Sequence, residues 1–315
     1  MRTVDRICAT LRVAARGTAV PLALAIVCAA SVAHADNITV GLFAPSEPFP
    51  STAARVELAK KLGDHLGTAL GGTGMGRVYA RAGDFASAVK KGDVAVALVD
   101  ATYLAGAGGN YTVIAAATRA GDATHGWQLV ARGADKISQL KGKRVLVPSV
   151  GGREADFVLN VLLGGEVGKD YFGKLEAVPD TASTLAALGL GKADAAVVPA
   201  SVELPAGVTT VLALPQLSGP VLVAYGNVSA AQKQALVAAA GTFKGDATVG
   251  GFKGAEADAV RSIARRFGVP VKRGPHAVPA VRVVVGDLVE SRTFTIERTP
   301  ATAFALAPSG DKVKP

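Results

Sequence analysis

A segment near the middle of the chain, between a predicted strand and a predicted helix, could bind an anion. It contains Ser149, Gly151, Gly152 and Arg153. Backbone N–H groups at a helix N-terminus point outward, and the helix dipole favours negative charge there. The glycines would let an oxyanion approach the backbone, and Arg153 could add a charge-assisted contact to a phosphate or carboxylate. The alternative is an N-capped helix whose first-turn arginine is solvated.

A second group of polar residues follows a predicted strand over residues 94–99. Asp100, Thr102 and Tyr103 would lie at the carboxyl end of that strand, where open α/β sheets bind ligands. Thr102 could donate a hydrogen bond to an oxyanion. Asp100 could instead pair with the ammonium group of a zwitterion, and it is an equally good candidate for a helix N-cap.

The other candidate ligand contacts lie in further connections between strands and helices. Ser46, Ser51 and Thr52 lie between the first predicted strand and helix, where Ser51 is also the expected N-cap. Arg119 ends another strand and Trp127 could form a wall of a binding cleft, although packing or solvation explains both as well. The last four candidates are Thr118, Thr181, Ser183 and Ser201.

The sequence carries no pattern typical of a metal site or of a nucleophilic enzyme. His65, His125 and His276 lack metal-ligand spacing, and there is no Gly-x-Ser-x-Gly motif or Walker phosphate loop. The glycine-rich residues 71–76 follow a predicted helix, which is the wrong context for a dinucleotide fingerprint, so we interpret them as a flexible loop. We therefore expect no catalytic residues, metal or cofactor, and an enzyme of the same fold is a minor alternative.

Residues 1–35 have the pattern of a secretory signal peptide. Basic residues precede an apolar run over residues 19–32, and a site of small residues ends at Ala35. We expect cleavage after Ala35, export to the periplasm and a soluble mature protein, because the run is short for a membrane span of roughly 20 residues. Lipidation of Cys28 is a minor alternative.

Composition narrows the function classes further. Both cysteines, Cys8 and Cys28, lie in the leader, so the mature chain has no thiol for a disulfide or a metal site. The formal net charge of +9 falls to +6 when the four arginines and Asp5 of the leader are removed. This charge is spread along the sequence, which is not typical of a nucleic-acid-binding protein. It favours encounter with anions, and simple solubility explains it equally well.

The rest of the chain alternates strands and helices, as in βαβ units. The first run comprises a strand at 38–41, a helix at 52–70, a strand at 77–80, a helix with Asp84 as its N-cap, and strands at 94–99, 113–117 and 129–131. The last two strands flank a polar loop that contains His125 and Trp127. Right-handed crossovers predict a parallel sheet.

A second run of the same kind begins at Leu140. Its expected elements are strands at 144–148, 175–178, 195–198, 208–212 and 221–224, and helices at 153–163, 181–190, 229–242 and 256–267. A Pro-rich bend separates the last two strands, and residues 280–297 alternate as a β-hairpin ahead of a polar tail. The length of the mature chain suits two lobes.

Three segments carry a family resemblance. Residues 140–145 read Leu-Lys-Gly-Lys-Arg-Val ahead of a strand and a Ser/Gly turn, residues 191–198 read Gly-Lys-Ala-Asp-Ala-Ala-Val-Val, and the strand at 94–99 runs into Asp-Ala-Thr-Tyr. In this order and spacing they resemble type II periplasmic substrate-binding proteins, most closely the phosphate, phosphite and phosphonate branch that serves ABC transporters. The resemblance covers about residues 38–245.

The resemblance implies an α/β fold of two lobes, each a mostly parallel sheet flanked by helices, with a ligand cleft between them. The phosphate, phosphite and phosphonate branch typically has several adjacent hydroxyls where this chain has Gly151 and Gly152. Sulfonates, carboxylates and a fragment of an organic cofactor therefore stay open as ligands beside phosphate and phosphonate. The implied parts are lobe 1 at 36–128 and 223–279, lobe 2 at 129–222, and a C-terminal hairpin and tail at 280–315.

We therefore expect a monomeric solute-binding component of an ABC-type uptake system. It would hold a small anionic or zwitterionic ligand without chemical turnover and pass it to a membrane permease. The alternative is a periplasmic sensor or adaptor of the same fold that signals to a membrane partner, for which the C-terminal hairpin is the one hint.

Overall fold

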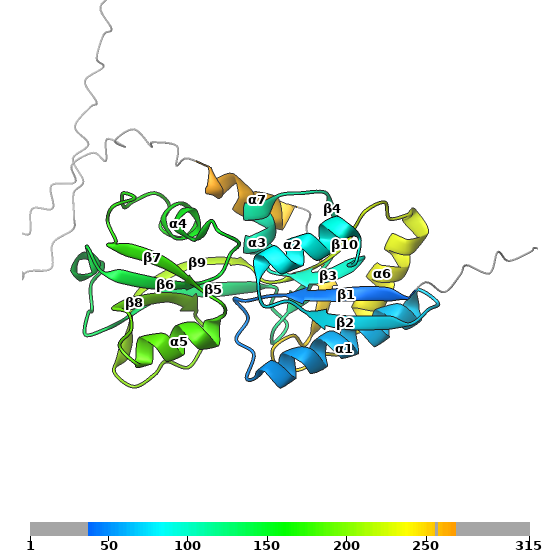
Figure 1. Ribbon diagram of the computed structural model, residues 1–315, viewed down its shortest axis with the longest axis horizontal. Helices are drawn as coiled ribbons and strands as arrows, with labels where there is room; N and C mark the ends of the chain where they lie inside the picture. The colour runs from blue at the N-terminus through cyan, green and yellow to red at the C-terminus, as the bar shows by residue number, and fades with distance from the viewer. Residues whose placement is uncertain (1–36, 256–257, 269–315) are drawn as a thin grey trace, which may run out of the picture. The chain divides into compact units, whose positions relative to one another are not determined.

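The computed structural model describes residues 37–255 and 258–268 (Figure 1). The leader, its cleavage point, His276 and the expected hairpin over residues 280–297 lie outside the described residues. Within those residues, no helix combines the length and the apolar character that a membrane span requires.

Six strands form the first sheet, in the order β11-β4-β10-β3-β1-β2. They are β1 (Ile38–Phe43), β2 (Gly74–Val78), β3 (Val96–Val99), β4 (Tyr111–Thr118), β10 (Val221–Tyr225) and β11 (Gly251–Gly254). β1 pairs in parallel with β2 and β3, but β10 is antiparallel to β3 and β4, and β11 is antiparallel to β4. The expectation of a parallel sheet is wrong for this half, because β10 enters directly from the second sheet rather than through a crossover helix.

Five strands form the second sheet, in the order β7-β6-β8-β5-β9. They are β5 (Thr124–Arg132), β6 (Arg144–Pro148), β7 (Lys174–Val178), β8 (Ala195–Pro199) and β9 (Val208–Ser218). β6 is parallel to β7 and β8, whereas β5 is antiparallel to β8 and β9. Each sheet with its helices forms one lobe, and both lobes combine parallel and antiparallel strands.

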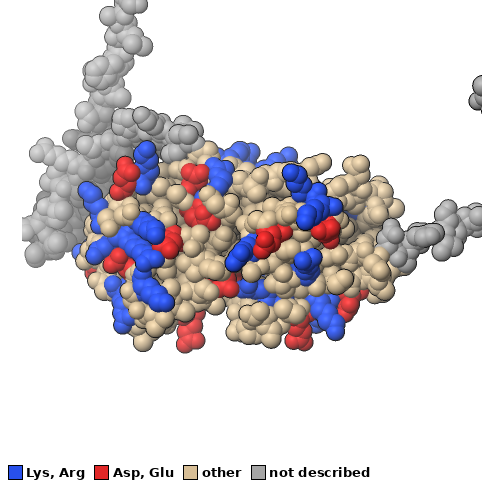
Figure 2. Space-filling model, viewed as in Figure 1, with Lys and Arg blue, Asp and Glu red and all other residues tan. Residues whose placement is uncertain are grey.

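Helices flank both sheets. They are α1 (Thr52–Ala69), α2 (Ala82–Lys91), α3 (Ala101–Ala107), the 3-10 helix η1 (Ile137–Leu140), α4 (Glu154–Asp156), the π-helix η2 (Phe157–Leu162), α5 (Thr181–Gly189), α6 (Ala230–Thr242) and α7 (Asp258–Phe267). α1 buries Leu58, Leu62 and Leu66 at helical spacing, and these pack with Leu236 of α6 on one face of the first sheet. Acidic and basic side chains are interspersed over the face shown in Figure 2.

The chain crosses between the sheets twice, at residues 119–123 and 219–220. The two crossings lie side by side, because Ala117 N donates to Pro220 O and Gly219 N donates to Ala123 O, each at 2.8 Å. β5 lies wholly in the second sheet and β10 wholly in the first. The lobe limits expected after residues 128 and 222 fall inside these two strands and stay predictions.

The interpretation of residues 71–76 as a flexible loop is wrong, because Gly74 and Gly76 belong to β2. A Cβ atom on Gly67 of α1 would lie 2.1 Å from Gly74 N, and one on Gly63 would lie 2.5 Å from Gly76 N. The glycines therefore allow α1 to pack directly on the backbone of β2.

Three further local expectations are wrong. His125 and Trp127 lie in β5 and not in a loop. Asp84 lies inside α2, whose N-cap is Arg81. β9 continues past residue 212 to Ser218, and its Pro215 is tolerated because β9 is an edge strand.

Candidate functional site

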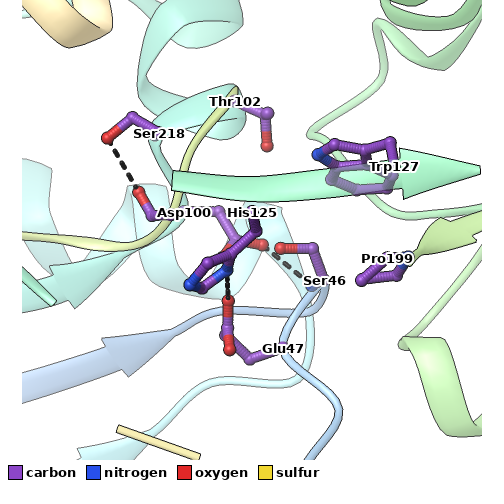
Figure 3. Close-up of a pocket in the computed structure, with 10 residues that line it drawn as sticks. Ser46, Glu47, Asp100, Thr102, His125, Trp127, Pro199 and Ser218 are labelled. Atoms are coloured by element: carbon purple, nitrogen blue, oxygen red, sulfur yellow. Dashed lines mark hydrogen bonds and ion pairs between the residues drawn. The ribbon is translucent and has the colours of Figure 1, made fainter. Parts of the chain in front are cut away.

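A small pocket lies between the two sheets, beside both crossings of the chain (Figure 3). Its walls come from the loop after β1, the start of α3, β5 and the ends of β8 and β9. The cavity measures about 10 Å³, which is room for roughly one water molecule. The residues that line it are Ser46, Glu47, Asp100, Ala101, Thr102, His125, Trp127, Pro199, Ser218 and Gly219.

Asp100 follows β3 and occupies the N-cap position of α3, but its side chain makes no cap hydrogen bond. Instead, its Oδ2 accepts a hydrogen bond from Ser46 N at 2.8 Å. Burial and, after it, the charge of Glu47 raise the pKa of Asp100 to about 7. The carboxyl therefore changes protonation state near neutral pH.

Three buried polar atoms around the pocket have no hydrogen-bond partner among the described residues. They are Asp100 Oδ1, Thr102 Oγ1 and His125 Nε2. Asp100 and Thr102 are each 2% exposed. Buried polar groups are normally paired, so three unpaired ones at a single pocket mark it as a candidate site for a water molecule or a polar ligand.

Glu47 holds the centre of an ion cluster at this pocket. It pairs with Nη2 of Arg119, and its Oε1 lies 2.9 Å from Nδ1 of His125. Arg119 also donates to Ser201 Oγ at 2.5 Å and to Thr248 O at 3.3 Å. The structure thus brings Ser201 to the edge of the cluster.

The sequence analysis did not identify Glu47 or His125 as site residues. A usable signal for Glu47 was present, because β1 and β3 are parallel neighbours whose carboxyl ends share one edge of the sheet. The same argument that selected Asp100 after β3 therefore applies to Glu47 after β1. His125 gave no such signal, because it was assigned to a loop.

The turn over residues 149–153 binds a carboxylate of the same chain, the side chain of Glu154. Glu154 Oε1 accepts hydrogen bonds from Val150 N at 3.0 Å and Gly152 N at 3.1 Å, and Ser149 Oγ lies 3.4 Å from the same atom. These residues do not line the pocket. Ligand contact by Ser149, Gly151 and Gly152 stays a prediction.

Arg153 joins the second lobe to α3 and α7. Its guanidinium pairs with Asp156 at 2.8 Å, donates to Phe267 O at 3.1 Å and Gly106 O at 3.4 Å, and stacks 4.8 Å from the centre of the Phe267 ring. These contacts occupy the guanidinium N–H groups that we expected to bind a ligand. Its role in ligand binding also stays a prediction.

The start of α5 contacts the loop after β1 in the other lobe. Thr181 Oγ1 donates to Ser46 O at 2.8 Å and Thr181 N donates to Pro45 O at 3.0 Å. Ser183 N donates to Asp180 Oδ1 at 2.8 Å, which caps α5. Thr181 thus lies behind the pocket and positions Ser46.

The remaining predicted contacts lie outside the pocket lining. Ser51 is confirmed as the N-cap of α1, because its side chain accepts from Ala54 N, and both it and Thr52 are exposed. Tyr103 is buried against Phe43, with ring centres 4.8 Å apart. Thr118 is half-buried at the end of β4.

No cluster of three or more histidine, cysteine or acidic side chains that could hold a metal ion occurs in the described part of the chain. The interactions seen at the pocket are hydrogen bonds and ion pairs. Its donors and acceptors are suited to hold a polar solute.

Residues 47–268 match the family model described as ABC transporter, phosphonate, periplasmic substrate-binding protein. No curated protein sequence matches the chain. Among solved structures, the chain resembles PhnD1 from Prochlorococcus marinus in complex with methylphosphonate, with a TM-score of 0.58 and 15% identity over 73% of this chain and 98% of that one.

Two other structures resemble the chain to the same degree. XAC2383 from Xanthomonas citri bound to ATP has a TM-score of 0.58 and 13% identity, over 73% of this chain and 96% of that one. PA3383 from Pseudomonas aeruginosa, a binding protein component of an ABC phosphonate transporter, also has a TM-score of 0.58, with 12% identity over 73% and 87%. At these identities the structures show the two-lobed fold.

Proposed function

Because the chain belongs to the periplasmic substrate-binding proteins of phosphonate ABC transporters, we propose that it holds a small anionic ligand in the pocket between its sheets. Proteins of this family are exported, bind small molecules without acting as enzymes, and deliver them to a membrane permease. The ligand class is a phosphonate or phosphate-like oxyanion. The protein releases this ligand without having altered it chemically. We also propose a monomer and cleavage after Ala35.

The unpaired polar atoms at the pocket carry this proposal. Thr102 Oγ1 and His125 Nε2 are buried without a partner in the described part of the chain. A hydroxyl can donate to an oxyanion. Nε2 of His125 can do the same when the ring carries both of its protons, because Nδ1 faces a carboxylate oxygen of Glu47. An oxyanion that enters the pocket would satisfy both groups and remove the cost of burying them unpaired.

The ligands named for two similar structures support the same class. PhnD1 is in complex with methylphosphonate and XAC2383 is bound to ATP. Both ligands carry a tetrahedral phosphorus centre with anionic oxygens, so an oxyanion is the chemistry that they share.

Thermal unfolding with a panel of phosphate, phosphite, phosphonates, sulfonates, carboxylates and amino acids tests the proposal. A ligand that binds the native state raises the unfolding midpoint by mass action. We expect a phosphorus oxyanion to give the largest rise. Thr102→Val should weaken its binding by about tenfold, the effect of losing one hydrogen bond to a charged group.

Thr68→Val is the matched control, because Thr68 is exposed on α1 and donates only to Asp64 O within its own helix. It should leave affinity unchanged. No rise with any compound in the panel would contradict the proposal. Phosphorus NMR of the recovered ligand should show the starting compound, and a product signal would contradict the absence of turnover.

A further inference from the structure

Glu47 lies between two basic side chains, those of Arg119 and His125. It belongs to the loop between β1 and α1, and it is 2% exposed. One carboxylate oxygen pairs with Arg119 and the other lies 2.9 Å from Nδ1 of His125. Figure 3 shows Glu47 and His125 pointing toward one another. A carboxylate of the chain itself thus makes the contacts that an oxyanion would need.

Arg119 meets the pocket through Glu47. It does not line the cavity, and its Nε and Nη1 donate to Thr248 O and Ser201 Oγ. The remaining contact of its guanidinium in the described residues is the pairing of Nη2 with Glu47. An anion would therefore have to take the place of Glu47 to bind the inner face of this guanidinium.

Space and charge also oppose an anion beside Glu47. The cavity of about 10 Å³ holds roughly one water molecule and not a phosphonate. Asp100, the other carboxyl at the pocket, is 2% exposed. An anion placed beside Glu47 in this desolvated site would be repelled by its like charge.

We propose that Glu47 is an internal counter-ion that an anionic ligand displaces from Arg119 and His125, so that Glu47 limits the affinity of the site for oxyanions. This inference rests on the proposed function and identifies Glu47 as the residue that limits the affinity of the same site. Exchange of one anion for another keeps both donors paired, whereas simple loss of Glu47 would leave the partly buried Arg119 without a counter-charge.

The movement required is a rotation of the Glu47 side chain. The backbone beside it is fixed, because Ser46 N is held by Asp100 and Ser46 O accepts from Thr181. Rotation would carry the carboxylate away from Arg119 and leave the loop in place. The released volume then becomes available to the ligand.

Calorimetric titration of Glu47→Gln with methylphosphonate and with inorganic phosphate at neutral pH tests the inference. The amide keeps the size of the side chain but competes weakly for Arg119, so the affinity should rise about tenfold or more over wild type. Glu57→Gln is the matched control, because Glu57 is exposed on α1 and its loss removes the same charge from the same lobe. It should bind as wild type does.

An affinity of Glu47→Gln equal to or below that of wild type overturns the inference. Binding by Glu47→Gln alone, with a silent wild type, supports it. If neither protein binds either anion, the proposed function fails and the inference falls with it. If Glu47→Gln does not fold, Glu47→Asp decides: it keeps the charge but withdraws it from both partners, so a smaller gain is expected and an absence of gain overturns the inference.

Discussion

At the scale of single residues, Asp100 couples the pocket to pH. Burial, followed by the charge of Glu47, raises the pKa of this carboxyl to about 7, above the value of about 3.9 in an unfolded chain. Between these two pKa values the folded state therefore keeps a proton on Asp100 that the unfolded chain has released. The stability that this proton contributes is lost as pH rises through 7. Asp100→Asn should relieve this loss.

We expect Asp100→Asn to gain unfolding free energy relative to wild type as pH increases from 5 to 8, by at most roughly 3 kcal/mol. The asparagine can still accept the hydrogen bond from Ser46 N. Urea unfolding at both pH values measures the difference. Asp84→Asn, at an exposed position on α2, is the control, and the same pH dependence in both variants would contradict the assignment.

What the sequence predicts at this scale depends on how local the signal is. Asp100 and Thr102 were identifiable because a strand end places them, and Ser51 because its cap contact spans three residues. The ion cluster of Glu47, Arg119 and His125 was not identifiable. Arg119 and His125 lie far from Glu47 in the chain and meet it only when the sheets come together. Glu154 was missed as the partner of the glycine turn because a nearby carboxylate looks like an ordinary helix residue.

At the scale of elements, the contact between α1 and β2 depends on absent side chains. A Cβ atom on Gly67 would lie 2.1 Å from the backbone N of Gly74. Gly67→Ala should force the helix away from the strand and lower the unfolding free energy by about 1–3 kcal/mol, as overpacking does. Chemical denaturation measures this change.

Gly83→Ala on α2 is the control for the glycine prediction. No atom lies within 4 Å of a Cβ at that position, so the change should be neutral or slightly stabilising. Equal destabilisation of both variants would show that the close approach is not the cause. Most elements were predictable from periodicity, but β2 begins at Gly74, three residues before the predicted strand at 77–80. Its glycines indicate a loop until the helix that packs on them is known.

At the scale of the whole molecule, polar contacts hold the lobes together on the side of α1 and α5. Arg55 of α1 pairs with Asp180, the N-cap of α5, at 3.1 Å. Burial opposes the charge of Asp180, but hydrogen bonds from Ser183 and the charge of Arg55 hold the pKa of its carboxyl below the usual value. The pair therefore stays ionised at neutral pH and bridges the two sheets.

Arg55→Met should loosen this bridge, and it replaces the cation–π contact of Arg55 over the ring of Phe49 with an apolar side chain. We expect a larger radius of gyration in solution scattering, because lobes of this fold move as hinged bodies, and a saturating ligand should reverse the increase. Arg144→Met is the control, since it removes a 2.6 Å ion pair with Glu176 inside the second sheet and should leave the radius unchanged. Equal radii for the two variants would mean that the pair does not restrain the lobes.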